Sequence, residues 1–325
     1  MTALNSASLG SQRAFWNIFA HADHLRQGRG RILQAIGYGP VESPSHVVFR
    51  NEVMTLRAYA HNQPNRPAIL LIPAPIKRSY ILDLAPENSV VRQWLSAGFA
   101  VYLLQWQPPG EAAQHWGLGE YADRFLLEVL EVLARKTGRE QVVLAGHSLG
   151  GTFAAIFAAL HPERVKGLVL LSAPLHFGTA VDALSHYVAA SPPATFITRA
   201  FGNVPGSFLS FSSALAAPGD FISRRWVDRV VCRAEPKARK TYLRVERWTL
   251  DEMPFPGKLF REVIEWLYRE NRFSRGLLEL NSRRALPSQV TCPLVCATEA
   301  QSDVSPPQSM RRFYDAASSA RKLWV

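Results

Sequence analysis

The chain has few cysteines for its length: three among 325 residues, namely Cys232, Cys292 and Cys296. Three cysteines cannot build a disulfide framework, so we expect a reducing compartment and a cytoplasmic protein. Cys292 and Cys296 flank an apolar tripeptide, and no pair of Cys or His residues follows them. This spacing differs from that of zinc sites, so the sequence predicts no metal site and no bound cofactor.

Long apolar runs are absent as well. No segment reaches the roughly 20 apolar residues of a membrane-spanning helix, and the N-terminus lacks the basic start and apolar stretch of a secretory signal. The net charge is +11, and basic residues outnumber acidic ones between residues 221 and 284. This excess fits a solvated helical surface, or a region that attracts a polyanionic substrate such as an acyl-CoA or an anionic surface. Nucleic acid is not expected as a partner, because no finger, homeodomain or RNA-recognition signature is present.

Short apolar segments alternate with amphipathic ones along most of the chain. Segments typical of strands cover 46–60 (two strands), 68–73, 99–106, 142–145, 167–174, 293–298 and 322–325. Segments typical of helices cover 10–36, 87–98, 119–138, the stretch after Ser148, and 305–317, where Ser305 and Gln308 are expected to cap the first turn. Such alternation predicts an α/β protein with a mostly parallel sheet and helices on both faces.

The alternation breaks in the middle of the chain, which suggests an insertion between two core strands. We expect an N-terminal helical segment over 1–45, a first part of the core over 46–175, an inserted lid over 176–288, and a second part of the core over 289–325. A lid at this place would lie over the ends of the strands, where sites in such sheets are found.

The stretch "QVVLAGHSLGGTF" (141–153) carries the chemistry. An apolar strand, a G-x-S-x-G turn and a helix follow each other, which is the setting that exposes a serine nucleophile in the α/β-hydrolase fold. Gly146 and Gly150 leave room for the sharp turn, and Ser148 stands at a helix N-terminus. The backbone N–H of Leu149 is the expected first donor of an oxyanion hole. In the loop after the 68–73 strand Pro75 has no N–H, so Ile76 is the expected second donor.

The sequence offers an acid for a catalytic triad but no histidine at the position where the base is expected. Asp303 follows a later strand and precedes a helix, where a carboxylate can stay ionised and orient an imidazole. In this fold the histidine should follow the next strand, but no histidine occurs after His186. His147 is adjacent to the serine and points away from it at a tight turn, so His176 is the remaining candidate for the base.

Several motifs resemble those of polyhydroxyalkanoate synthases. They are "YILDLAPENSVVRQWLSAGFAVYLLQW", the elbow followed by a second glycine, "PFPGKLFREVIEWLYRENRFSRGLLELNSRR", and "VTCPLVC" with a following Asp and "SPP". The resemblance covers roughly residues 65–175 and 248–310, and it implies an α/β-hydrolase fold with transfer of 3-hydroxyacyl groups from CoA to a polyester through a Cys-His-Asp triad. Carried over, the nucleophile position is Ser148 and the acid is Asp303. The chain departs from the family pattern in having serine at the elbow, in placing the Asp one residue nearer to the prolines, and in lacking the histidine.

The sequence therefore leaves three functions open. The chain is expected to transfer acyl groups through an acyl-Ser148 intermediate, or to hydrolyse esters, thioesters or polyesters on the same scaffold. It could also be a catalytically impaired binding subunit, because the triad histidine is absent. The stop within the apolar "KLWV" segment favours a chain that ends before its histidine loop. Acyl-CoA or an ester is the expected substrate, and a homo-oligomer or a second subunit is a further expected partner.

Overall fold

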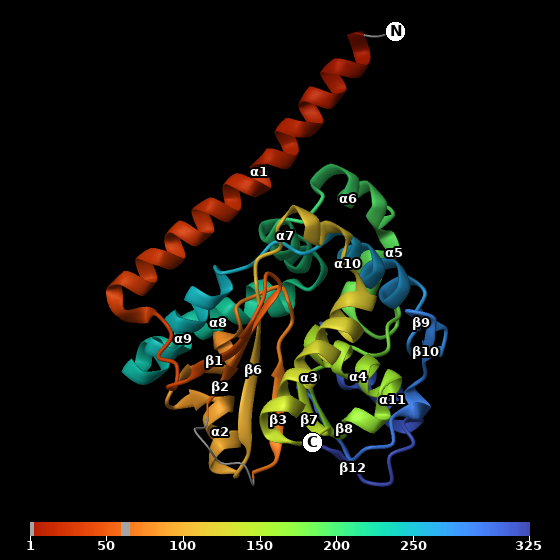
Figure 1. The fold of residues 1–325 in the computed structure, drawn as a ribbon. Coiled ribbons are helices and arrows are strands. Elements are labelled where there is room, and N and C mark those ends of the chain that lie inside the picture. The colour runs from red at the N-terminus through yellow and green to blue at the C-terminus, as the bar shows by residue number, and fades with distance from the viewer. Residues whose placement is uncertain (1–2, 60–65) are drawn as a thin grey trace.

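The computed structural model describes residues 3–59 and 66–325. Its centre is an eight-stranded sheet in the order β1-β2-β6-β3-β7-β8-β11-β12 (Figure 1). In this order, each neighbouring pair in β6-β3-β7-β8-β11-β12 is parallel, whereas β2 runs antiparallel to both β1 and β6. The strands of this sheet are β1 His46–Arg50, β2 Met54–Ala58, β3 Ala68–Ile72, β6 Ala100–Trp106, β7 Val142–His147, β8 Val165–Leu171, β11 Leu294–Ala297 and β12 Lys322–Trp324. The predicted α/β class with a mostly parallel sheet is confirmed.

Apolar side chains alternate between the two faces of this sheet because successive residues of a strand point to opposite sides. On β3, Leu70 and Ile72 join the larger buried cluster, whereas Ile69 and Leu71 join the smaller one. The larger cluster packs against α3, α4 and α11, and the smaller one packs against α2. These helices are α2 Val90–Ser96, α3 Phe125–Thr137, α4 Leu149–Leu160 and α11 Pro307–Ala316. Helices therefore cover both faces, as expected.

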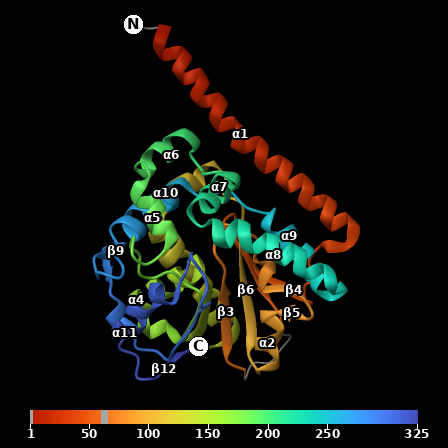
Figure 2. The same ribbon diagram turned by 180° about the vertical axis from the view of Figure 1, so that it is seen from behind.

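The segment between β8 and β11, which we call the insert, is mostly helical. Its helices are α5 Ala183–Ala190, α6 Ala194–Phe201, α7 Gly206–Ala216, α8 Arg224–Val231, α9 Pro236–Thr249 and α10 Gly257–Glu262. Figures 1 and 2 show α5, α6, α7 and α10 gathered at one end of the sheet. The N-terminal helix α1 Ala3–Leu33 runs along α9 and also contacts α7. Buried apolar residues from Met253 to Ala285 belong to the main core cluster, so the last part of the insert packs with the sheet. The lid role and the four-segment division stay predictions.

Shorter elements complete the chain. Two small antiparallel pairs are formed by β4 Asp83–Ala85 with β5 Asn88–Ser89, and by β9 Leu278–Leu280 with β10 Arg283–Ala285. Short helical turns lie at Gln34–Tyr38, Ser79–Leu82, Glu111–His115, Glu120–Arg124, Pro162–Arg164, Gly219–Ser223, Cys232–Ala234, Val263–Arg269 and Pro287–Gln289. The predicted capping of α11 by Ser305 is wrong. Pro306 holds the N-cap position and makes no side-chain cap, and the Ser305 hydroxyl instead lies 3.3 Å from that of Ser309.

Candidate active site

Ser148 stands at a strained turn between β7 and α4. Its φ of 53° and ψ of −131° lie outside the regions that residues with a side chain normally adopt. The backbone N–H of Ser148 donates to the carbonyl of Leu171 on the neighbouring strand at 2.9 Å, and its carbonyl accepts from the N–H of Gly151 at 2.8 Å. The strand on one side and the helix on the other thus hold the serine in this conformation. Strain of this kind, when the surroundings enforce it, is a mark of functional sites.

Gly146 and Gly150 are required because neighbouring backbone atoms lie too close to leave room for a side chain. A Cβ on Gly150 would lie 2.2 Å from the carbonyl oxygen of Ile72, and a Cβ on Gly146 would lie 2.4 Å from the Cα of Gly151. Both distances are far below contact distance and involve backbone atoms that cannot move aside. The spacing G-x-S-x-G is therefore a steric demand of the way α4 packs against the ends of β3 and β7.

The two expected oxyanion donors lie on the first turn of α4 and on the loop after β3. Leu149 is the first residue of α4, so its N–H lies in the turn whose donors have no partner within the helix. The loop with Ile76 is fixed from the insert side, because the N–H of Met253 donates to the carbonyl of Ile76 at 2.8 Å. Lys77 continues this contact in an isolated antiparallel bridge with Glu252 and in an ion pair of 3.2 Å. The roles of Leu149 and Ile76 stay predictions.

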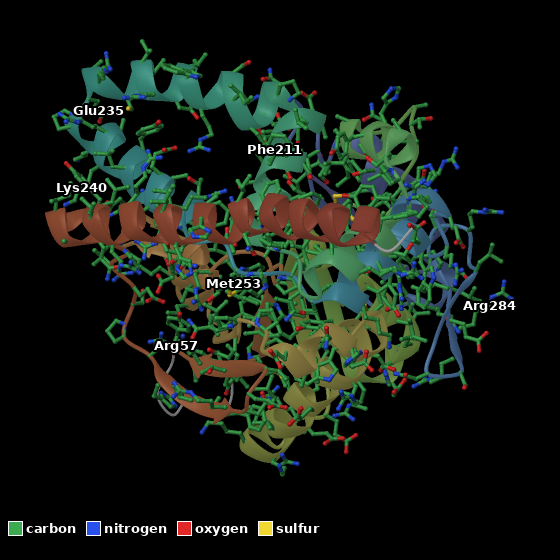
Figure 3. All side chains as sticks on the ribbon, turned by 90° about the horizontal axis from the view of Figure 1, so that it is seen from above. Arg57, Phe211, Glu235, Lys240, Met253 and Arg284 are labelled. Carbon is green, nitrogen blue, oxygen red and sulfur yellow. The ribbon has the colours of Figure 1, made fainter. Side chains whose placement is uncertain are left out.

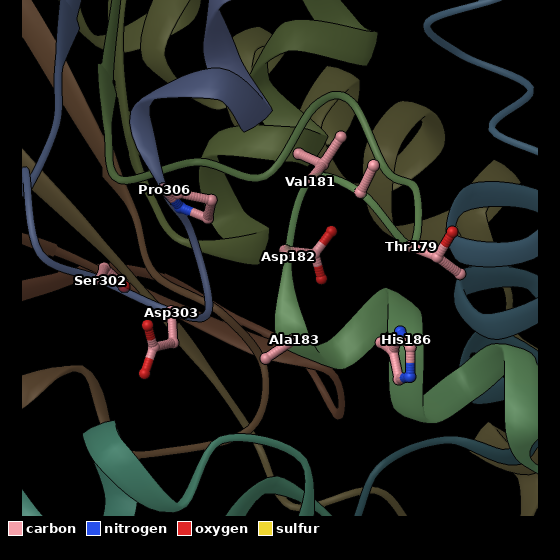
Figure 4. A pocket seen from close by; sticks show the side chains of 9 residues that line it. Thr179, Val181, Asp182, Ala183, His186, Ser302, Asp303 and Pro306 are labelled. Carbon is pink, nitrogen blue, oxygen red and sulfur yellow. The ribbon is translucent and has the colours of Figure 1, made fainter.

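Asp303 lies on the loop between β11 and α11, with an exposed side chain. The loop borders a pocket of about 350 Å³, whose other wall is formed by Thr179 to Ala183 and His186. Figure 4 shows Asp303 on the loop before Pro306, with His186 on α5 across the pocket. The backbone carbonyl of Asp303 accepts a hydrogen bond from the N–H of Ala183 at 3.1 Å. The expected acid is therefore on a loop that the insert contacts directly.

A residue that sequence reasoning missed, Asp220, holds this loop. Its Oδ2 accepts the backbone N–H of Asp303 at 2.7 Å and that of Val304 at 3.2 Å. Its Oδ1 pairs with Arg224 at 3.0 Å, and the same Nη1 atom pairs with Glu299 at 3.1 Å. The insert is thus tied to both ends of the loop. In the sequence, Asp220 and Arg224 stand four residues apart, which predicts an ion pair within a helix. This spacing does not indicate that Asp220 contacts Asp303, 83 residues away.

His176 follows β8 and is buried. Its Nδ1 lies 2.9 Å from the hydroxyl of Ser274 and 2.8 Å from Nδ2 of Asn271. An amide nitrogen can only donate, so Nδ1 accepts and the proton of the neutral ring is on Nε2. Burial, and after it the charge of Arg312, lowers the pKa of His176 below its ordinary value. A role as the base would require the proton to move to Nδ1, so the assignment of His176 stays a prediction.

The topology brings the four candidate loops to one edge of the sheet. Ile76, Ser148, His176 and Asp303 follow β3, β7, β8 and β11, which are neighbouring parallel strands, and the carboxyl ends of parallel strands meet at the same edge. Within residues 3–59 and 66–325, no hydrogen bond joins the Ser148 hydroxyl to Asp303 or to a histidine. The structure therefore fixes the backbone at Ser148, and the described contacts place no base on its hydroxyl; its role as the nucleophile stays a prediction.

Cys292 and Cys296 carry thiols that are poorly suited to act as nucleophiles. Burial raises the pKa of Cys292 to about 11 and that of Cys296 to about 12. A thiol with such a pKa is almost entirely protonated at neutral pH and reacts poorly. Among the described residues no group of three His, Cys, Asp or Glu side chains is placed to hold a metal ion.

Comparison with known proteins agrees with this architecture. The alpha/beta hydrolase fold family matches residues 67–324. The chain belongs to this family. The N-terminal region of poly-beta-hydroxybutyrate polymerase (PhaC) matches residues 24–95. The family membership and the resemblance to polyhydroxyalkanoate synthases are thereby confirmed, whereas the exchange of cysteine for serine at the elbow is not tested.

Two relatives are PhaC subunits of poly(3-hydroxyalkanoate) polymerases. The one from Haloferax mediterranei is 29% identical over 86% of this chain and 57% of its own length. The one from Allochromatium vinosum is 27% identical over 91% of this chain and 84% of its own length. The chain thus spans little more than half of the first relative and most of the second.

Solved structures of other members of the fold are also similar. A monoacylglycerol lipase from Paleococcus ferrophilus has a TM-score of 0.51 and 18% identity, over 85% of this chain and 88% of its own. A naproxen esterase from Bacillus subtilis has a TM-score of 0.50 and 15% identity, over 93% and 90% of the two chains. At this identity the likeness shows the fold alone. Among the described residues, no helix has the length and apolar character needed to cross a bilayer.

Proposed function

We propose that the chain is a serine-dependent acyl-transfer enzyme of the polyhydroxyalkanoate synthase type, which acts on hydroxyacyl thioesters. The observation that carries this proposal is the strained Ser148 between β7 and α4, with glycines pressed against the neighbouring backbone. A serine held at positive φ at the start of a buried helix is costly for stability and useful for nucleophilic attack. The similarity to PhaC subunits supports a thioester as the substrate.

The proposed reaction has two steps. In the first, the Oγ of Ser148 attacks the thioester carbonyl, and the backbone N–H groups of Leu149 and Ile76 stabilise the oxyanion. The C–S bond then breaks, the acyl group remains on Ser148 as an ester, and the serine proton ends on the thiol of CoA. In the second step a hydroxyl group of another hydroxyacyl chain takes the acyl group, and its proton returns to Ser148.

These proton transfers need a general base, and His176 is the predicted one. Asp303 would orient an imidazole, and His176 is the predicted imidazole in the chain. The hydrogen bond from Asn271 to Nδ1 keeps the proton of neutral His176 on Nε2. To accept a proton on Nε2, His176 would first have to lose this hydrogen bond and carry its proton on Nδ1. His176→Ala should lower the rate of acylation strongly if His176 is the base. It should leave that rate nearly unchanged if the ring only packs the loop after β8.

Hydrolysis is the second candidate function, and the identity of the nucleophile favours it. An oxygen ester on Ser148 is less prone than a thioester to pass its acyl group to another hydroxyl, which gives water more time to act. An esterase, thioesterase or polyester hydrolase would form the same intermediate and release a free acid. A binding subunit would form no intermediate at all.

The test is intact-mass spectrometry of the purified chain after incubation with 3-hydroxybutyryl-CoA, and separately with an activated acyl ester. Wild type is compared with Ser148→Ala, and Cys292→Ser controls for labelling of a thiol. We expect one acyl group per chain on wild type and on Cys292→Ser, and none on Ser148→Ala. Polymer in the product would indicate transfer, and free hydroxy acid would indicate hydrolysis. Absence of an adduct with both reagents would contradict the proposal and favour a binding subunit.

Two further expectations belong with this proposal. Assembly into a homo-oligomer, or with a second subunit, is to be checked by light scattering of the protein with and without substrate. The predicted cytoplasmic location is to be checked by fractionation of the cells that produce it.

A further inference from the structure

Helix α8 presents an apolar face to solvent. Trp226, Val227, Val230 and Val231 are exposed by 62%, 59%, 60% and 67%. Their spacing of one, four and five residues places them on one side of the helix, and we call them the α8 apolar face. A tryptophan and three valines form a contiguous apolar patch that is exposed to solvent. Such patches on protein surfaces usually mark interaction sites.

Basic residues outnumber acidic ones in α8 and the start of α9. Between residues 224 and 240 the basic residues are Arg224, Arg225, Arg229, Arg233, Lys237, Arg239 and Lys240, and the acidic ones are Asp228 and Glu235. The guanidinium of Arg229 lies 5.5 Å from the ring centre of Trp226. The combination of an apolar strip and a strong positive excess is that of an amphipathic helix lying on an anionic interface.

Two arginines at the start of α8 tie the helix to the rest of the protein. Arg225 pairs with Glu246 on α9 at 2.7 Å, and Arg224 pairs with Asp220 and Glu299. These contacts hold the start of the helix against α9 and the loop after β11, and the four side chains of the α8 apolar face remain exposed. Figure 3 shows the helix along the outer edge of the molecule, between the labelled Phe211 and Glu235.

We propose that the α8 apolar face docks on the surface of a bilayer that contains anionic phospholipid. Trp226 and the valines would enter the boundary between headgroups and acyl chains, and the neighbouring Arg and Lys side chains would contact lipid phosphates. A second copy of the chain fits less well. A twofold contact would place the same positive surface against itself, and like charges would then oppose each other across the interface. The proposal is independent of the function proposed for Ser148.

The test is flotation of the full chain with vesicles of phosphatidylcholine alone, and with vesicles of phosphatidylcholine and phosphatidylglycerol in about equal amounts. We expect binding to the second vesicles only. Trp226→Ser should weaken this binding by about tenfold, and Arg229→Glu by about fivefold or more. Leu277→Ser, at an apolar residue exposed by 47% elsewhere, and Lys136→Glu, on the exposed end of α3, are the matched controls and should bind like wild type.

The controls separate docking from general attraction by a positively charged protein. If Lys136→Glu weakens binding as much as Arg229→Glu, the attraction is due to net charge alone and the proposal is wrong. It is also wrong if Trp226→Ser changes the mass of the lipid-free protein in sedimentation, because the face then joins copies of the chain. As a second readout, brominated lipid should quench tryptophan fluorescence in wild type more than in Trp226→Phe. Equal quenching would place Trp226 outside the bilayer and overturn the proposal.

Discussion

The two ends of helix α4 have opposite properties. At its N-terminus Ser148 is strained, and no hydrogen bond of its hydroxyl is found in the described part of the chain. Just past its C-terminus, about 18 Å away for a helix of this length, His161 Nε2 lies 2.6 Å from Asp123 Oδ1. In this second region a histidine and a carboxylate are hydrogen-bonded to each other, whereas within the described residues neither kind of side chain is bonded to the Ser148 hydroxyl.

The distant pair is fully satisfied and buried. Asn281 donates to Asp123 at 2.8 Å, Arg283 donates to Nδ1 of His161 at 3.2 Å, and the His161 ring stacks on that of Phe157 at 4.6 Å. Both side chains of the pair are less than a tenth exposed. A His–Asp pair therefore does not make a catalytic site by itself. Here it joins α4 to β10 and to the turn before α3, at the opposite end of α4 from Ser148.

Removing the serine hydroxyl should give the largest effect. Ser148→Ala is expected to lower the rate of acylation by about 10⁴-fold or more, because only binding and the oxyanion hole remain. The measurement is CoA release followed by chromatography, with the thermal transition as a control for folding. A variant that keeps more than a hundredth of the wild-type rate would place the chemistry at another residue.

Breaking the other end of α4 should affect stability and leave chemistry almost unchanged. His161→Ala removes one partner of a buried pair, and we expect the free energy of unfolding to fall by about 3 kcal/mol. Denaturant titration measures this loss, and the double variant with Asp123→Ala shows how much of it belongs to the pair. An acylation rate that falls along with stability in native buffer would show that this region is coupled to Ser148.

The sequence predicted the Ser148 end well because everything needed there is local. The apolar strand, the two glycines and the apolar helix are contiguous in the chain, and the steric reason for the glycines can be stated without a structure. The loops of Ile76 and Asp303 were found in the same way, from the strands that precede them.

The partners of these loops could not be predicted, because they come from distant parts of the chain. Asp123 and His161 are 38 residues apart, and Asp220 contacts Asp303 from the insert, whose order of helices was not readable from composition. The capping of α11 failed for a different reason. Ser305 was one position too early, since the proline pair moves the start of the helix to Pro307.

Loosening the loop of the expected acid should have a smaller effect than removing the serine. Asp220→Ala removes the acceptor of the Asp303 and Val304 N–H groups, and we expect the acylation rate to fall by about tenfold through misplacement of the loop. Asp220→Asn keeps an acceptor oxygen and should recover most of the loss, although it weakens the pair with Arg224. The comparison uses kcat and KM for the thioester. A change in KM alone, equal in both variants, would mean that Asp220 shapes substrate binding and does not position Asp303.

The smallest expected effect is a pH dependence of stability at the satisfied end of α4. Burial alone would raise the pKa of Asp123. The hydrogen bonds from His161 and Asn281 and the charge of Arg283 outweigh it, and they lower the pKa of Asp123 below 3.8. A carboxyl group whose pKa is lower in the folded state stabilises the fold above its unfolded pKa, and this contribution is lost as the pH falls through the folded value. The difference in unfolding free energy between wild type and Asp123→Asn should therefore be constant at neutral pH and shrink below about 3.8. A difference that persists unchanged into acid would mean that the variant loses packing or hydrogen bonds and not the charge of Asp123.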